Sequence, residues 1–138
     1  MIVETISGIS PHRWIGIPRD VGKSAHYFAE RGCFIDCRGE LEIDPTAELG
    51  FDIRIFTATH DPDWLLGGIT GYRFAKVTIG PNAWICSSAM LYNCTIGEGA
   101  IVALGSVVRS MTVHPFTMVA GNPAKIIGYF KDGEWIHG

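Results

Sequence analysis

Aliphatic residues recur every six positions through most of this sequence, and a small residue follows each one four positions later. The pattern is clearest in residues 79–90, where Ile79 and Ile85 are followed by Ala83 and Ala89. An α-helix would need apolar residues at spacings of three and four, and the glycines and β-branched residues here oppose a long helix. A six-residue repeat can supply one short strand and one bend, so three repeats close one triangular coil. We therefore predict an all-β fold, a parallel β-helix of stacked coils.

The same frame continues on both sides of this segment. Its other pairs are Cys37 and Leu41, Ile43 and Ala47, Leu49 and Ile53, Ile55 and Thr59, Leu91 and Thr95, Ile96 and Ala100, Val102 and Ser106, and Val108 and Thr112. The step from Leu91 to Ile96 is one residue short, which indicates a tightened corner. Each opening aliphatic is expected to point inward, where its burial is worth roughly 1.5–3 kcal/mol. The sequence has enough repeats for about three coils, which is near the lower limit for a stable solenoid, so association between copies would help to stabilise the fold.

Two regions depart from the repeat. Residues 61–78 form an excursion whose aromatic and leucine side chains indicate that it packs against another part of the protein, such as a neighbouring subunit. Residues 1–36 lack the frame, and we predict that they form an N-terminal cap, with a possible short helix over Lys23–Glu30. The cap belongs to the same domain as a β-helix over residues 37–138, which carries the excursion and a C-terminal tail.

Composition narrows the possible partners. A net charge of −3 and a pI near 5.9 give no broad cationic field, so nucleic acid is a poor candidate. The first ten residues lack the regions of a secretory signal, and no apolar run reaches the roughly eighteen residues that cross a bilayer. We therefore expect a cytoplasmic protein with no membrane span. The four cysteines have neither metal-site nor disulfide-scaffold spacing, and we expect reduced, packed thiols.

Three passages stand in a fixed order within the repeat frame: residues 55–62, 77–85 and 119–126. They read Ile-Phe-Thr-Ala-Thr-His-Asp-Pro, Val-Thr-Ile-Gly-Pro-Asn-Ala-Trp-Ile and Val-Ala-Gly-Asn-Pro-Ala-Lys-Ile. Together they resemble the hexapeptide-repeat acyltransferase superfamily, and most closely its sugar and polysaccharide O-acetyltransferases of the galactoside and maltose type. The resemblance covers roughly residues 37–130 and implies that the β-helix is left-handed. Residues 1–36 do not resemble the longer N-terminal helical region of those enzymes, so the acceptor stays open.

The resemblance implies a homotrimer that transfers an acetyl group from acetyl-CoA to a sugar hydroxyl, in a surface polysaccharide or its precursor, at sites between subunits. It implies that His60 is the general base. A histidine with an ordinary pKa near 6.5 is largely neutral at pH 7, so it can accept the proton of the acceptor hydroxyl. It would return a proton to the leaving thiolate, and no covalent acyl-enzyme is required.

Further site residues follow from the same resemblance. The small residues Ala103, Gly105 and Ser106 would let the pantetheine arm approach the backbone, and Lys125 could meet a coenzyme phosphate. For each of these residues, an ordinary role in the coil or on the surface is the alternative. The residues placed to meet the sugar acceptor are Asp61, Asp63, Trp64, Asn82 and Trp84.

Three other functions are possible for this pattern. A γ-class carbonic anhydrase would need three histidine ligands for zinc, and no second histidine lies near His60, so we expect no metal. An N-acyltransferase acting on an amino sugar would use similar chemistry. A trimeric scaffold or glycan-binding protein could retain the fold without catalysis. The sequence leaves the last two open.

Overall fold

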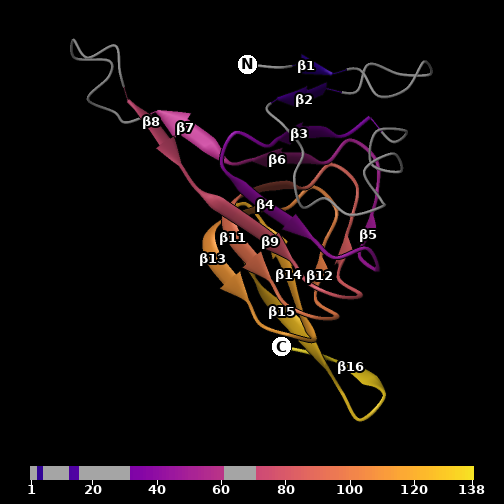
Figure 1. Cartoon of the computed structure of the whole chain (residues 1–138). Coiled ribbons are helices and arrows are strands. Elements are labelled where there is room, and N and C mark those ends of the chain that lie inside the picture. Colours follow the sequence, from indigo (N-terminus) through magenta and orange to yellow (C-terminus); the bar gives the residue numbers. More distant parts are fainter. Residues whose placement is uncertain (1–2, 5–12, 16–31, 61–70) are drawn as a thin grey trace.

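The computed structural model describes the backbone of residues 3–4 and 13–15, and residues 32–60 and 71–138 in full. All secondary structure within these ranges is strand, and it forms the predicted left-handed parallel β-helix (Figure 1). The possible helix over Lys23–Glu30 lies outside the described residues. The strands are β1 (Val3–Glu4), β2 (Arg13–Ile15), β3 (Phe34–Asp36), β4 (Glu40–Ile43), β5 (Glu48–Leu49), β6 (Arg54–Phe56), β7 (Ala58–His60), β8 (Tyr72–Phe74), β9 (Lys76–Ile79), β10 (Trp84–Ile85), β11 (Met90–Ile96), β12 (Ile101–Val102), β13 (Val107–Val113), β14 (Thr117–Gly121), β15 (Ala124–Lys131) and β16 (Glu134–His137).

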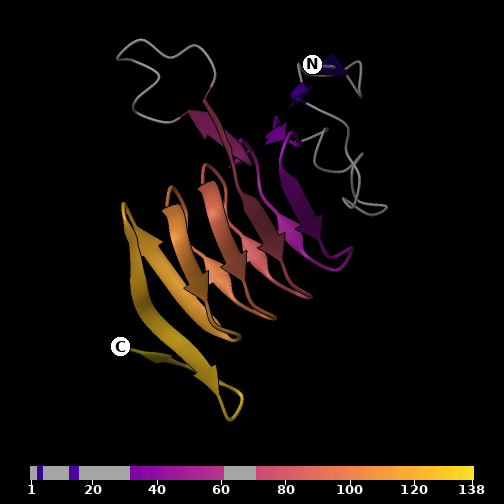
Figure 2. The ribbon, with the colours of Figure 1, turned by 60° about the vertical axis from the view of Figure 1, so that its left-hand side comes forward.

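The coil has three faces, each a ladder of parallel strands (Figure 2). The first face contains β3, β6 and the first halves of β11 and β13. The second face contains β4, β9 and the second halves of β11 and β13. The third face contains β5, β10, β12 and β14. Each coil therefore passes through all three faces and places its strands beside those of the next coil.

Every face contributes one column of inward aliphatic side chains, none of which is more than 3% exposed. The three columns are Ile35, Ile55, Leu91 and Val108; Ile43, Ile79, Ile96 and Val113; and Leu49, Ile85, Val102 and Val119. The members of a column are direct partners in adjacent strands, so each side chain packs on its equivalents above and below. This stacking confirms the repeat as the organising feature of the fold.

The corner between the first and second faces is tighter than the six-residue frame predicts. In β11 and β13 the inward aliphatics are five residues apart, and the chain turns at Asn93 and Ser110, which have φ of 47° and 51°. The shortened step turns Cys94 inward and leaves Thr95 exposed. Thr112 is exposed at the equivalent place in β13. The tightened corner predicted from the short step between Leu91 and Ile96 is therefore present, and β13 repeats it.

The start of the coil and the excursion also differ in detail from the sequence frame. Ile35, rather than Cys37, occupies the first column, because β3 pairs in parallel with β6 upstream of residue 37. Thr59 is exposed, because the chain leaves the coil in β7. The parallel ladder resumes at β9, within the predicted excursion. The division into a cap over residues 1–36 and a coil over residues 37–138 stays a prediction.

Antiparallel strands close the C-terminal end of the third face. β15 pairs with β14, and β16 pairs with β15. The two strands extend beyond the last coil at the end opposite β1 (Figure 1). No helix among the described residues is long and apolar enough to cross a membrane.

Candidate functional site

His60 is carried by a β-hairpin that leaves the coil between its first and second faces. It is the last residue of β7, and it lies directly opposite Tyr72 in the antiparallel strand β8. Figure 1 shows the hairpin projecting away from the coil. The sequence predicted the excursion but not that its two ends pair as strands.

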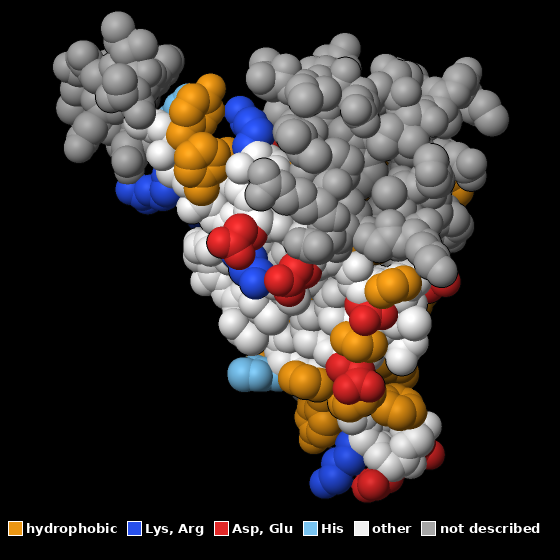
Figure 3. Space-filling view, viewed as in Figure 1, with side chains coloured by type: hydrophobic (Ala, Val, Ile, Leu, Met, Phe, Trp, Pro, Cys, Tyr) orange, Lys and Arg blue, Asp and Glu red, His pale blue; other side chains and the backbone are white. Residues whose placement is uncertain are grey.

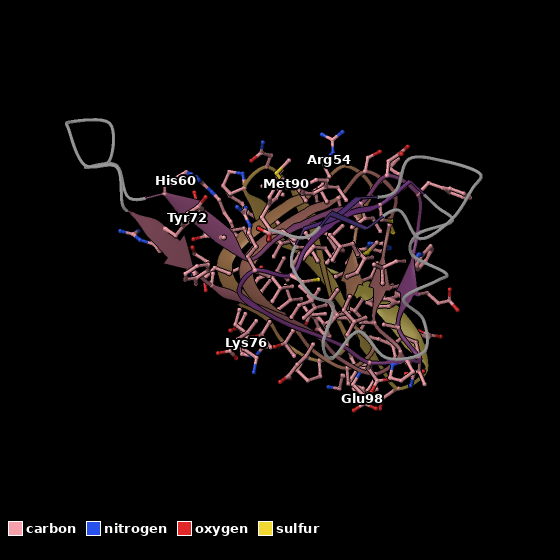
Figure 4. All side chains as sticks on the ribbon, turned by 45° about the horizontal axis from the view of Figure 1, so that its top comes forward. Arg54, His60, Tyr72, Lys76, Met90 and Glu98 are labelled. Carbon is pink, nitrogen blue, oxygen red and sulfur yellow. The ribbon has the colours of Figure 1, made fainter. Side chains whose placement is uncertain are left out.

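The imidazole of His60 has a defined orientation. Its Nδ1 lies 3.2 Å from the carbonyl oxygen of Gly71. A carbonyl can only accept a hydrogen bond, so Nδ1 is the donor in this contact, and the tautomer with this donor has its lone pair on Nε2. The imidazole also packs on the Tyr72 ring, with centroids 4.7 Å apart and planes tilted by 37° (Figure 4). The side chain is exposed at the surface of the hairpin.

Hydrogen bonds tie the base of this hairpin to the first coil. The hydroxyl of the buried Thr57 donates to the backbone oxygen of Asp36 at 2.6 Å and accepts from the N–H of Gly39 at 2.9 Å. The N–H of Ala75, on the returning strand, donates to the Thr57 carbonyl at 2.8 Å. A Cβ at Gly39 would overlap the carbonyl oxygens of Thr57 and Ala75. Both ends of the excursion therefore depend on one close contact that only glycine permits.

A buried ion pair lies in the same cluster. The carboxylate of Asp36 is wholly buried and receives hydrogen bonds from Nε and Nη2 of Arg38 at 2.9 and 3.1 Å. The hydrogen bond to Asp36 is the largest cause that raises the pKa of the Arg38 guanidinium above its ordinary value. Burial, with a smaller effect from the Asp36 charge, raises the pKa of the Cys37 thiol to about 12. The guanidinium carbon of Arg38 lies 5.5 Å from the centroid of the Tyr72 ring.

The outer surface of the hairpin is aromatic. Tyr72 and Phe74 are 55% and 60% exposed, and their rings stack 5.9 Å apart with planes 14° apart. Figure 3 shows hydrophobic side chains gathered over this hairpin. The sequence did not single out Asp36, Arg38 or Tyr72 as site residues. The alternation of Tyr72 and Phe74 around Arg73 was the one signal for a strand here.

A cleft of about 390 Å³ lies on the corner from which the hairpin emerges. Its lining residues are Lys76, Asn93, Cys94, Thr95, Ser110, Met111 and Thr112. The ammonium of Lys76 lies 3.1 Å from Glu42 and 3.7 Å from Glu40, and the hydrogen bond to Glu42 is the first cause that raises its pKa. The cleft is therefore polar along one side and follows the tight corners of β11 and β13.

The residues predicted to bind coenzyme are brought together, but at a different corner. Ala103, Gly105 and Ser106 form the turn from β12 on the third face to β13 on the first. Ser106 is wholly buried, and its hydroxyl donates to the Ala103 carbonyl at 2.6 Å and accepts from the N–H of Gly121 at 3.3 Å. Its contribution to a ligand site would therefore be to shape this turn. Lys125 is exposed on β15, which pairs with the strand that ends at Gly121.

A second cleft, of about 480 Å³, lies one coil away on this same corner. The N–H of Gly105 donates to the carbonyl of Ser87, which connects the turn to the neighbouring coil. No atom lies within 4 Å of the place that a Cβ of Gly105 would occupy, so the backbone is open to approach there. The lining residues of the cleft are Asp52, Arg54, Ser88, Ala89 and Met90.

The residues predicted to meet the acceptor divide into two groups. Asn82 lies in the turn between the second and third faces, with φ of 56°, and its N–H donates to the hydroxyl of Thr46 at 2.9 Å. Trp84 begins β10 and is 51% exposed. One chain thus places His60, the coenzyme candidates and these two residues at three different corners. The remaining candidates, which lie outside the described residues, are Asp61, Asp63 and Trp64.

Among the residues that the structure describes, no group of three or more histidine, cysteine, aspartate or glutamate side chains could hold a metal ion. The four cysteines form no disulfide, and of the four only Cys86 is not buried.

Comparisons with known proteins place this geometry in context. No protein-family model matches the sequence. A Schizosaccharomyces pombe protein that bears the name "putative acetyltransferase" is 33% identical in an alignment 115 residues long, which covers 78% of this chain and 54% of that protein. A maltose O-acetyltransferase structure from Clostridium difficile 630 is 29% identical with a TM-score of 0.67, over 72% of this chain and 54% of that one. A hexapeptide-repeat acetyltransferase from Vibrio cholerae, solved with acetyl coenzyme A, is 25% identical with a TM-score of 0.56, over 72% and 58%. The chain spans about half the length of the curated relatives it matches.

Proposed function

Since the chain has the fold of the hexapeptide-repeat acetyltransferases and is related to them in sequence, we propose that it transfers the acetyl group of acetyl-CoA to a sugar hydroxyl. The proposed acceptor is a sugar of a surface polysaccharide or its precursor, and the proposed active unit is a cytoplasmic homotrimer. The coenzyme would contact Ala103, Gly105 and Lys125. Ser106 would hold the turn that contains Ala103 and Gly105 in its shape.

The proposed role of His60 depends on the orientation of its ring. Because Nδ1 donates to the carbonyl of Gly71, Nε2 is the atom that can accept a proton. Nε2 would remove the proton of the acceptor hydroxyl as its oxygen attacks the thioester carbonyl. When the tetrahedral intermediate collapses, the C–S bond breaks, and the imidazolium returns the proton to the coenzyme A thiolate. The products are the acetyl ester and free coenzyme A, with His60 again neutral.

The separation of the site residues supports the trimer. Within one chain, His60 and the turn that contains Gly105 lie at different corners of the coil. A neighbouring copy that set its own Gly105 corner against the hairpin would complete the site. Stacking between copies would also add burial to a solenoid with few coils.

The first experiment measures thiol release from acetyl-CoA with a panel of sugars and amino sugars. His60→Asn is the informative variant, because the asparagine amide can replace Nδ1–H as the donor to Gly71 but cannot act as a base. We expect turnover to fall by about 10²–10⁴ while the fold is kept. His114→Asn, the same exchange at an exposed position on another turn, is the matched control and should turn over as the wild type does.

The outcomes separate the open alternatives. Thiol release with amino sugars only would favour N-acylation. Binding of sugar without thiol release from any substrate would favour the scaffold. Wild-type turnover by His60→Asn would rule out His60 as the base.

A further inference from the structure

An ion pair, an aromatic ring and the proposed base form one connected series. The Asp36 carboxylate accepts from the Arg38 N–H at 3.0 Å and from the Thr57 N–H at 3.3 Å, in addition to the two guanidinium bonds. Four donors therefore hold a carboxylate that is wholly buried. Such a carboxylate is held in one position, because removing any donor would leave a buried charge less well solvated.

The geometry of Arg38 extends this rigidity outward. The guanidinium is fixed by a two-point fork, which a lysine ammonium cannot reproduce. Its side chain is 28% exposed and reaches the Tyr72 ring, at 5.5 Å from carbon to centroid. Tyr72 is 55% exposed, and the Phe74 ring stacks on its ring from the same strand. The Arg38 guanidinium adds a cation–ring contact.

Tyr72 in turn contacts His60, both as its cross-strand partner and through the ring contact at 4.7 Å. We propose that Arg38, fixed by Asp36, is a positioning residue that orients the His60 imidazole through the Tyr72 ring. The inference rests on the proposed function, because a defined imidazole orientation matters most if Nε2 must meet a substrate hydroxyl. Misplacing a reacting group by about 1 Å costs roughly a hundredfold in rate, so a small rotation of the ring would be measurable.

The test uses the full chain and begins with a readout that does not depend on activity. The Hε1 proton resonance of His60 is identified as the signal that the His60→Asn spectrum lacks. The Tyr72 ring current displaces this resonance, and Tyr72→Leu defines its position without the ring. We expect Arg38→Lys to move the signal toward the Tyr72→Leu position, and Arg109→Lys, the same exchange on β13, to leave it in place. An unchanged signal in folded Arg38→Lys would overturn the inference.

Kinetics provide a second readout. We expect Arg38→Lys to lower kcat by roughly tenfold to a hundredfold, with the KM for acetyl-CoA changed less than twofold. If Arg38 acts through Tyr72, the double variant Arg38→Lys with Tyr72→Leu should lose no more kcat than Tyr72→Leu alone. Multiplied losses would contradict the inference, and so would a change confined to KM.

Two variants keep the test decisive. Asp36→Asn removes the charge that fixes the guanidinium and should shift the His60 signal in the same direction as Arg38→Lys. If Asp36→Asn does not fold, the test depends on Arg38→Lys, which is tolerated more easily because the Arg38 side chain is partly exposed. Should His60→Asn keep wild-type turnover, His60 is not the base, yet the resonance comparison still decides whether Arg38 orients the ring.

Discussion

The hydroxyl of Thr57 offers a sharp test of how the excursion is attached to the coil. The side chain is wholly buried, and its Oγ1 makes one hydrogen bond as donor, to Asp36, and one as acceptor, from Gly39. Thr57→Val keeps the shape and removes both bonds. Each bond contributes about 1 kcal/mol net, and a buried partner left unsatisfied costs roughly 1–3 kcal/mol. Because Gly39 is partly exposed, its N–H can recover some hydration, and we expect a total loss of about 2–4 kcal/mol.

The assay is equilibrium unfolding in urea, with thermal unfolding as a second probe. A loss of this size should lower Tm by roughly 5–15 °C. Thr57→Ser is the matched control, since it keeps the hydroxyl and removes one buried methyl group, worth about 0.8 kcal/mol. The urea m-value should stay constant in both variants, which would assign the change to the folded state. Thr57→Val within about 0.5 kcal/mol of wild type, or less destabilising than Thr57→Ser, would refute the reasoning.

Three further predictions concern the core, the thiols and the glycine contact. Leu91→Ala should reduce the free energy of unfolding by about 2–5 kcal/mol, because it leaves a cavity within a column of buried aliphatic side chains. Leu104→Ala is the control, since Leu104 is 72% exposed, and it should change this free energy by less than about 0.5 kcal/mol in the same urea titration. In the folded protein the pKa values of Cys37 and Cys94 are raised to about 12, so above pH 9 the unfolded chain releases protons that the folded chain retains. The free energy of unfolding should therefore fall by about 1.4 kcal/mol per pH unit for each thiol up to pH 12. Replacing both cysteines with alanine should flatten this pH dependence, and an equally steep dependence in that variant would contradict the raised pKa values. Gly39→Ala should destabilise the protein by several kcal/mol, through overlap with two carbonyl oxygens, and a Tm near that of the wild type would show that the contact relaxes easily.

The coil could be predicted because each six-residue repeat has one aliphatic residue at a fixed position. Burial of that residue is also the main energetic requirement of the fold. Ile79, Ile85 and Ile96 could be assigned inward from spacing alone, since each stacks on an equivalent residue in the next coil. The inward residue of the tight corner could not be assigned. Whether Cys94 or Thr95 turns inward depends on a left-handed backbone at Asn93, and local composition does not specify it.

The candidate site could be predicted only in part. The passage over residues 55–62 singled out His60, whose role as a base stays a proposal. Its neighbours were hidden because they come from distant segments: Arg38 from the first coil and Tyr72 from the far end of the excursion. Asp36 and Arg38 are two residues apart, as in many exposed ion pairs, and only the fold shows that one of them is wholly buried.

The antiparallel pair at the C-terminal end has a consequence for assembly. A ladder of parallel strands has no intrinsic length, because the edge of its last strand can accept a strand from any similar molecule. On the third face this edge belongs to β14, and β15 occupies it in the opposite direction. An incoming copy that tried to extend the coil would meet a reversed strand, so its own six-residue register could not continue. The final hairpin thus blocks end-to-end growth of the coil into fibres on this face.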